Sequence, residues 1–112
     1  MKVIDTSMPF GSSARTRVLL ALQLLTESYA RELARLLEIS LSSVQKALIS
    51  LERDGLVAGR AAGRTRLFRV NPRNYARKEL ECYLDRLLES ETTLRARASE
   101  LRRRPRRSGK PL

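Results

Sequence analysis

Histidine and tryptophan are both missing from this 112-residue chain, and cysteine occurs once. Without histidine, the chain has no Ser–His or Cys–His nucleophile pair and no histidine general base or metal ligand. The single cysteine, Cys82, cannot form a disulfide within the chain, so we expect a cytoplasmic protein. Aromatic residues make up only 4% of the chain, which predicts an aliphatic core and disfavours a site that stacks single-stranded bases.

Other features of common functional classes are also missing. The sequence has no glycine-rich phosphate loop and no cluster of carboxylates, so we expect neither an enzyme nor a cofactor or metal site. The longest apolar run, residues 18–25, is interrupted by Gln23 and is too short to cross a bilayer. The N-terminus contains serines and few basic residues, which does not resemble a signal peptide. We therefore expect no membrane contact.

Positive charge is abundant and unevenly distributed. Lysine and arginine total 23 against 12 acidic residues, which gives a net charge of +11, and 19 of the 23 are arginine. Because the arginine fork suits phosphates and guanine edges, this bias indicates nucleic acid. Six arginines and no acid fall within residues 60–77, and seven arginines and one lysine within 95–112. Such clusters indicate basic faces directed at an anionic partner, although a basic tail can also serve solubility alone.

Apolar residues recur at helical spacing through the first half of the chain. Ser12 or Ser13 can cap the first helix, Ser28 the second and Ser40 the third. Gly55 follows the third helix, where a left-handed C-terminal cap favours glycine. We expect these three helices over residues 12–25, 29–37 and 41–54.

The helical period then stops. Residues 56–60 and 64–70 have the pattern of two strands, and Gly63 lies in the short turn between them, which predicts a hairpin. Pro72 ends the second strand because proline cannot donate to a ladder. Asn74 can cap a fourth helix.

Leucine recurs every seven residues after the hairpin, from residue 80 to residue 101. This heptad predicts one long helix that pairs with a second copy of the chain. The alternative is that the leucines cover the first helix of the same chain. The residues assigned to the dimer contact are Leu80, Leu84, Leu87 and Leu94.

A known arrangement emerges from these elements. Residues 30–49 resemble a helix-turn-helix, and residues 12–73 resemble a winged helix-turn-helix of the bacterial regulator type. The matching strings are ELARLLEISLSSVQKAL over 32–48, LERDGLV over 51–57 and GRTRLFRVNP over 63–72. The chain resembles small regulators of the ArsR and MarR kind, and also the winged-helix domains that accompany bacterial nucleotidyltransferases. The resemblance implies a mainly α fold with a small β-hairpin wing (α+β) and a long C-terminal helix.

This resemblance also implies a DNA-binding surface. The outward, N-terminal part of the third helix would enter the major groove, where glutamine can bond adenine and leucine can touch a thymine methyl. Lys46 is better suited to phosphate, and the wing arginines would follow the backbone or enter a narrow minor groove. The implied DNA-binding residues are Ser40, Leu41, Ser42, Ser43, Gln45, Lys46, Arg60, Arg64 and Arg66.

Two features depart from the regulator pattern. Glu38 occupies the turn where glycine is usual, and a left-handed non-glycine residue costs about 1 kcal/mol, so we expect a reshaped turn or a longer second helix. Leu41 and Ile49 are apolar where polar residues are commoner, which also suits a protein partner.

The sequence therefore predicts a function and two alternatives. The first is a homodimeric, sequence-specific regulator of transcription that binds double-stranded DNA and represses by occluding polymerase. The second is a protein-interaction module that partners a separately encoded enzyme such as a nucleotidyltransferase. The third is a non-specific, architectural DNA binder led by its arginine tail. The expected segments are an N-terminal arm (1–11), a winged helix-turn-helix (12–73), a C-terminal dimerisation helix (74–101) and a basic disordered tail (102–112).

Overall fold

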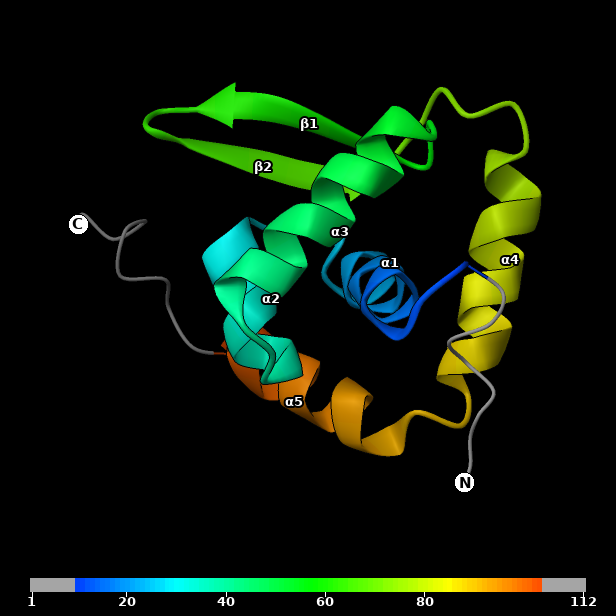
Figure 1. The fold of residues 1–112 in the computed structure, drawn as a ribbon. Coiled ribbons are helices and arrows are strands. Elements are labelled where there is room, and N and C mark those ends of the chain that lie inside the picture. Colours follow the sequence, from blue (N-terminus) through cyan, green and yellow to red (C-terminus); the bar gives the residue numbers. More distant parts are fainter. Residues whose placement is uncertain (1–9, 104–112) are drawn as a thin grey trace.

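A computed structural model describes residues 10–103 of the chain. The expected N-terminal arm, apart from Phe10 and Gly11, and the expected tail beyond Arg103 lie outside the described residues. The elements are α1 (Ser13–Leu25), α2 (Ala30–Leu37), α3 (Leu41–Arg53), β1 (Val57–Ala62), β2 (Thr65–Val70), α4 (Arg77–Leu88) and α5 (Thr92–Arg103) (Figure 1).

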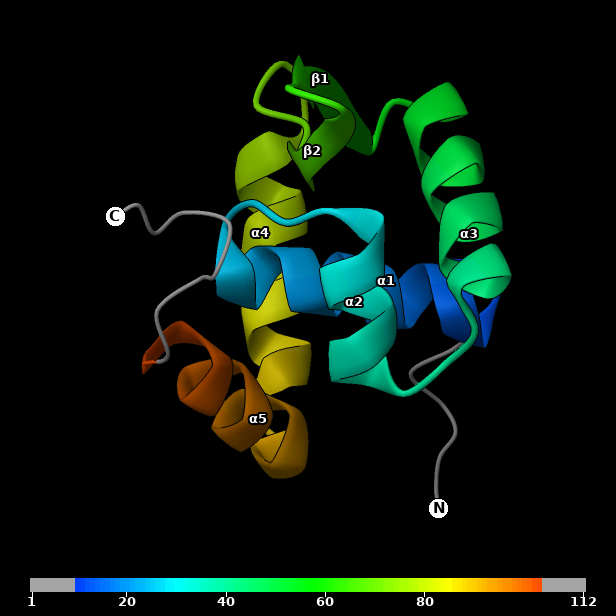
Figure 2. The ribbon, with the colours of Figure 1, turned by 90° about the vertical axis from the view of Figure 1, so that its left-hand side faces the viewer.

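Helix α1 is the centre of the fold. Its N-terminus is capped as expected, because the Ser12 hydroxyl accepts a hydrogen bond of 3.1 Å from the backbone N–H of Arg15. The other four helices and β2 all contact α1, which is viewed end-on in Figure 1 and from the side in Figure 2. Apolar residues on several faces of α1 are therefore buried, and they form the middle of an aliphatic core.

Helix α2 begins differently from the prediction. Ser28 does not cap it: the N-cap is Tyr29, and the Ser28 backbone instead exchanges two hydrogen bonds with Phe68 of β2, at 3.0 and 2.7 Å. The Ser28 hydroxyl donates to the Glu32 carboxylate at 2.6 Å. Ser28 is fully buried, so this isolated bridge attaches the start of α2 to the hairpin. The capping prediction was wrong because the backbone of Ser28 pairs with a distant strand.

The turn between α2 and α3 keeps the shape that glycine usually gives it. Glu38 adopts the left-handed conformation (φ 58°, ψ 44°), and α2 ends at Leu37. The prediction of a reshaped turn or a longer second helix is therefore wrong. Glu38 adopts the left-handed conformation despite the steric cost of a non-glycine residue there. The Arg17 side chain supports the turn by donating to the Leu37 carbonyl at 2.8 Å.

Helix α3 follows the sequence prediction closely. The Ser40 hydroxyl accepts from the Ser43 backbone N–H at 3.1 Å, so the predicted N-cap is confirmed. Val44 and Leu48 are buried against α1 and α2, as expected for the inward face. Gly55 ends the segment with φ 81°, the conformation for which glycine was expected.

The hairpin forms as predicted, but its turn is one residue shorter because β1 extends to Ala62. Its antiparallel register pairs Val57 with Val70 and Ala62 with Thr65, so the turn holds only two residues, including Gly63 at φ 65°. The hairpin is held at its base by two amides after β2, because Asn71 and Asn74 each donate to the Gly55 carbonyl at 2.9 Å. This double contact fixes the wing to the end of α3.

The start of the C-terminal segment also differs from the prediction. Asn74 does not cap a helix that begins at Tyr75. Its side-chain oxygen accepts from the Ala76 backbone N–H at 2.8 Å in a local turn, and α4 begins at Arg77.

The single long helix expected over residues 74–101 is wrong. The chain leaves helical geometry after Leu88, where the N–H groups of Glu89, Ser90 and Glu91 bond carbonyls three residues earlier. Helix α5 then turns back and packs across α1 and α2 (Figures 1 and 2). Tertiary packing explains the break, because Leu94 and Ala98 join the core only when α5 folds back. Arg102 and Arg103 belong to α5 and not to a disordered tail.

Because of the break, the leucines spaced seven residues apart no longer lie along one helix. Leu84 is fully buried and Leu94 is 9% exposed, and both lie in the core of their own chain. Leu80 and Leu87 are only half-buried against that core. The alternative interpretation, that these leucines cover the same chain, therefore accounts for Leu84 and Leu94.

Candidate nucleic-acid interface

The outward face of α3 carries mostly polar side chains near its N-terminus. Ser42, Gln45 and Lys46 are exposed, whereas Leu41 and Ser43 are half-buried. The three serines also contact one another, because the Ser40 hydroxyl lies 3.3 and 2.8 Å from the hydroxyls of Ser42 and Ser43. Lys46 has no carboxylate partner among the described residues. The face thus offers one amide and one unneutralised ammonium group to an external partner.

A groove separates this face from the wing. One part, of about 380 Å³, lies between the middle of α3 and β2, and its walls include Ile49, Phe68 and Gln45. A neighbouring part, of about 640 Å³, extends toward Leu41 and Tyr29. Gln45 and Arg64 line both parts, so α3 and the wing border one continuous groove.

Arg60 on β1 is paired with a carboxylate. Its guanidinium donates to both oxygens of Glu27, at 3.1 and 3.2 Å. Glu27 lies in the segment between α1 and α2, so this pair connects the wing to the loop before α2. Arg60 therefore makes an intramolecular contact while its side chain stays 59% exposed, and its contact with DNA stays a prediction.

Arg66 on β2 is held still more closely. It donates to both oxygens of Glu52 on α3, at 3.3 and 2.9 Å, and its guanidinium carbon lies 5.2 Å from the centre of the Phe68 ring. The hydrogen bond to Glu52, together with the negative charge of that carboxylate, raises the pKa of Arg66 above its usual value. Gly59 makes room for this stack, because a Cβ there would lie 2.7 Å from Arg66 Nη2 and 2.9 Å from Phe68 Cε1.

Arg64 differs from the other two wing arginines. It is exposed at the hairpin turn, it lines the groove, and it has no carboxylate partner among residues 10–103. Of the three arginines predicted to contact DNA, Arg64 alone therefore presents an unpaired charge. The carboxylates that pair with the other two, Glu27 and Glu52, were missed because they lie 33 and 14 residues away in sequence.

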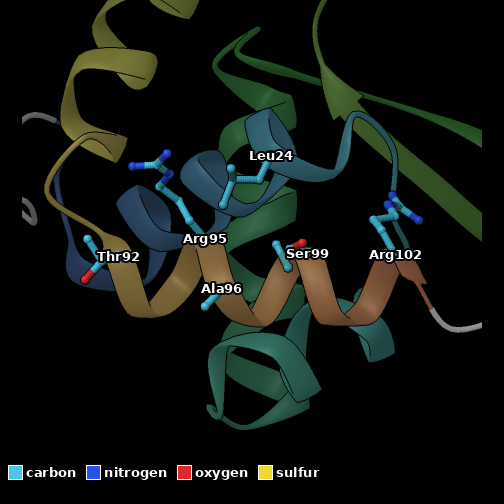
Figure 3. Close-up of a pocket in the computed structure, with 7 residues that line it drawn as sticks. Leu24, Thr92, Arg95, Ala96, Ser99 and Arg102 are labelled. Carbon is cyan, nitrogen blue, oxygen red and sulfur yellow. The ribbon is translucent and has the colours of Figure 1, made fainter.

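Helix α5 makes a second basic surface on another side of the molecule. Arg95, Ser99 and Arg102 project from it toward α1, next to a hollow of about 560 Å³ (Figure 3). Arg102 is engaged, since it donates to the Leu25 and Glu27 carbonyls at the end of α1. Arg97 on the same helix forms an ion pair with Glu38, so α5 is tied to the helix-turn-helix turn.

The described residues form neither a metal site nor a membrane-spanning helix. Within residues 10–103, no group of three or more cysteine, aspartate or glutamate side chains lies together as a metal site. Within the same range, none of the helices has the length and apolar character needed to cross a membrane.

Comparisons with known proteins give matches to structures only. No protein-family model and no curated protein matches the sequence. A variant of Lactococcus lactis ZitR matches with a TM-score of 0.56 and 21% identity, over 84% of this chain and 66% of that one. The adhesin competence repressor AdcR from Streptococcus pyogenes matches with a TM-score of 0.56 and 21% identity, over 84% of this chain and 68% of that one. The fold is a winged helix-turn-helix. The chain spans about two thirds of the length of these structures.

The likeness confirms the expected fold class. Helices α2 and α3 form the helix-turn-helix, and β1 and β2 form the wing. At this level of identity the likeness establishes the fold alone, so the function must be argued from the groove and its side chains.

Proposed function

We propose that the chain is a sequence-specific regulator of transcription that binds double-stranded DNA as a homodimer and acts as a repressor. The observation that carries this proposal is the groove, in which the exposed face of α3 and the unpaired Arg64 of the wing lie side by side. A winged helix with these groups offers base-reading and phosphate-binding chemistry on one surface.

The proposed role of each side chain in DNA binding follows from its chemistry. Gln45 presents an exposed amide that matches the N6 and N7 edge of adenine in the major groove. Lys46, one residue further along α3, is suited to a phosphate as a point charge. Arg64 at the hairpin turn would reach the flanking backbone or a narrow minor groove. The net charge of +11 adds a sequence-independent attraction to DNA.

A homodimer is favoured by the outer surface of α5. Ala96 is exposed and lines two hollows, one shared with Leu24 and the other with Leu36. The small side chain of Ala96 on the outer side of α5 leaves room for the side chains of a second copy. Two helix-turn-helix units related by a two-fold axis would then meet successive major grooves, about 10 base pairs apart, at an inverted repeat.

Repression is the proposed mode of action. A dimer on its operator would block polymerase sterically and would need no separate activating domain. AdcR, which shares this fold, is named a repressor.

The first test is selection of DNA by the purified protein from a random duplex pool at about 150 mM salt, where loose phosphate attraction is largely screened. The proposal predicts enrichment of an inverted repeat. Binding without enrichment, which fades smoothly as salt rises, would instead support a non-specific architectural binder.

The homodimer is tested separately by sedimentation of Ala96→Arg. We expect the wild-type chain to sediment as a dimer and this variant as a monomer. Thr93→Arg is the matched control, because it adds the same charge at an exposed position of α5 that lines neither hollow. A wild-type monomer at concentrations that bind DNA would contradict the dimer.

A second function is favoured by one observation, the exposed Ile49 on α3. An apolar side chain at this place also suits a protein-interaction module that docks a separately encoded enzyme. Leu41→Lys would distinguish the two functions, since loss of a protein partner with DNA binding retained would favour the module.

A further inference from the structure

One row of side chains on α3 combines apolar and amide groups. Leu41, Gln45 and Ile49 are spaced four residues apart, so they lie one above the other on the same side of the helix. Gln45 lines both parts of the groove, with Leu41 in one part and Ile49 in the other. These three residues, called here the α3 row, therefore face the wing along the groove.

The exposure of Ile49 is unusual for its residue type. Its side chain is 64% exposed, whereas the adjacent Leu48 is 2% exposed in the core. Isoleucine is among the residues most often buried, and here Ile49 lies in a groove beside Arg64 and Arg66, where it can make an apolar contact. A partner that fills this groove would present an apolar group close to negative charge.

A·T base pairs in the major groove supply both. Adenine presents an acceptor and a donor that match a glutamine amide, thymine presents a C5-methyl group, and the flanking phosphates are negative. We propose that the α3 row reads A·T base pairs, with Gln45 bonding an adenine and with Leu41 and Ile49 contacting thymine methyl groups. This inference rests on the proposed function and specifies the DNA that the same site selects.

The dimensions of the row fit a short A·T segment. Eight residues at a rise of about 1.5 Å separate Leu41 from Ile49 by about 12 Å along the helix. At about 3.4 Å per base pair, that length covers three to four base pairs. The selected half-site should therefore contain a core of three to four base pairs rich in A·T.

Charge around the row favours DNA over an acidic protein segment as the occupant. Lys46 and Arg64 lie beside the row without carboxylate partners among the described residues. The nearest acid on α3, Glu52, is engaged by Arg66, so its repulsion of phosphates is reduced. Unpaired cations on both sides of an apolar and amide row match phosphates on both sides of base edges.

Replacement of thymine by deoxyuridine in the selected duplex tests the methyl contacts directly, because it removes only the C5-methyl group. We expect roughly fourfold weaker binding for each contacted methyl, the effect of exposing one buried methyl group. Leu41→Ala and Ile49→Ala should each abolish the sensitivity to one deoxyuridine. Lys46→Ala is the matched control, because it should weaken binding to thymine and deoxyuridine duplexes equally.

Three outcomes would overturn the proposed base contacts of the α3 row. Equal binding of the thymine and deoxyuridine duplexes would overturn the α3 row and leave the sequence-specific regulator intact. An unchanged deoxyuridine effect in both alanine variants would also overturn the row, and would leave protein docking as the use of Ile49. Selection that enriches no duplex would overturn both the row and the proposed function.

Discussion

The exposed face of α3 and the wing border the same groove, yet their charged groups have different surroundings. On α3, Lys46 has no carboxylate partner among the described residues. In the wing, Arg60 and Arg66 each donate to both oxygens of a carboxylate from another part of the fold. The number of cations in a segment therefore overstates the charge that the segment offers to DNA. In this fold, Lys46 on α3 and Arg64 in the wing carry the free charges, whereas Arg60 and Arg66 connect the wing to other elements.

The largest expected effect separates the inner side of α3 from its outer side. Leu48→Ala should lower the free energy of unfolding by about 2–5 kcal/mol, because it leaves a cavity next to α1. The adjacent Ile49→Ala should change it by less than about 0.5 kcal/mol, because this side chain is exposed. Urea unfolding of both variants measures the difference, and equal losses would contradict the assigned faces.

The next effect concerns how the wing is held. Gly59→Ala places a methyl group 2.9 Å from the buried ring of Phe68, so we expect a loss of about 1–3 kcal/mol in the free energy of unfolding. Ala61→Ser, an exposed change on the same strand, is the control and should have little effect. If thermal unfolding of the Gly59 variant matches that of the wild-type chain, the close packing of Arg66 on Phe68 is incorrect.

A smaller effect distinguishes free from paired arginines. Arg64→Ala should reduce the slope of log affinity against log salt concentration by about one, since one phosphate contact is lost. Arg60→Ala should reduce it less, because Glu27 already neutralises this guanidinium. Titration of a fluorescent duplex at several salt concentrations gives both slopes. A larger change in slope for Arg60→Ala than for Arg64→Ala would contradict the assignment of Arg60 as the paired arginine and Arg64 as the free one.

The smallest expected effect concerns Glu52. Glu52→Gln removes a negative charge from the groove and releases Arg66, so binding to every duplex should become slightly tighter, with unchanged discrimination between sequences. The pKa of Arg66, no longer raised by the carboxylate, should fall toward its usual value, and its charge persists at neutral pH. Glu79→Gln on α4 is the charge-matched control. Weaker binding by Glu52→Gln would show that the pair is needed to position the wing.

The sequence predicted those parts of the fold that depend on local interactions. Ser12 and Ser40 cap their helices as expected, and Gly55 takes its left-handed conformation, because each contact lies within a few residues. Ser28 was misassigned because its backbone pairs with Phe68, 40 residues further along the chain.

Long-range packing also explains the other differences. A heptad of leucines is compatible with one straight helix, but burial of Leu94 and Ala98 against the core requires the chain to turn back after Leu88. On the outward face of α3, exposure of Gln45 and Lys46 agrees with the sequence prediction, and their contacts with DNA remain a prediction. The neutralisation of Arg60 and Arg66 was not predictable, because their partners come from separate elements.

Under the proposed function, Gln45 on α3 reads a base in a groove that the wing completes. The most direct test of this role compares wild-type protein and Gln45→Ala on every single-base-pair variant of the selected duplex at about 150 mM salt. We expect Gln45→Ala to lose about 1–3 kcal/mol of discrimination at one A·T pair in each half-site and to keep it elsewhere. Uniform weakening at all positions, with discrimination unchanged, would contradict the account.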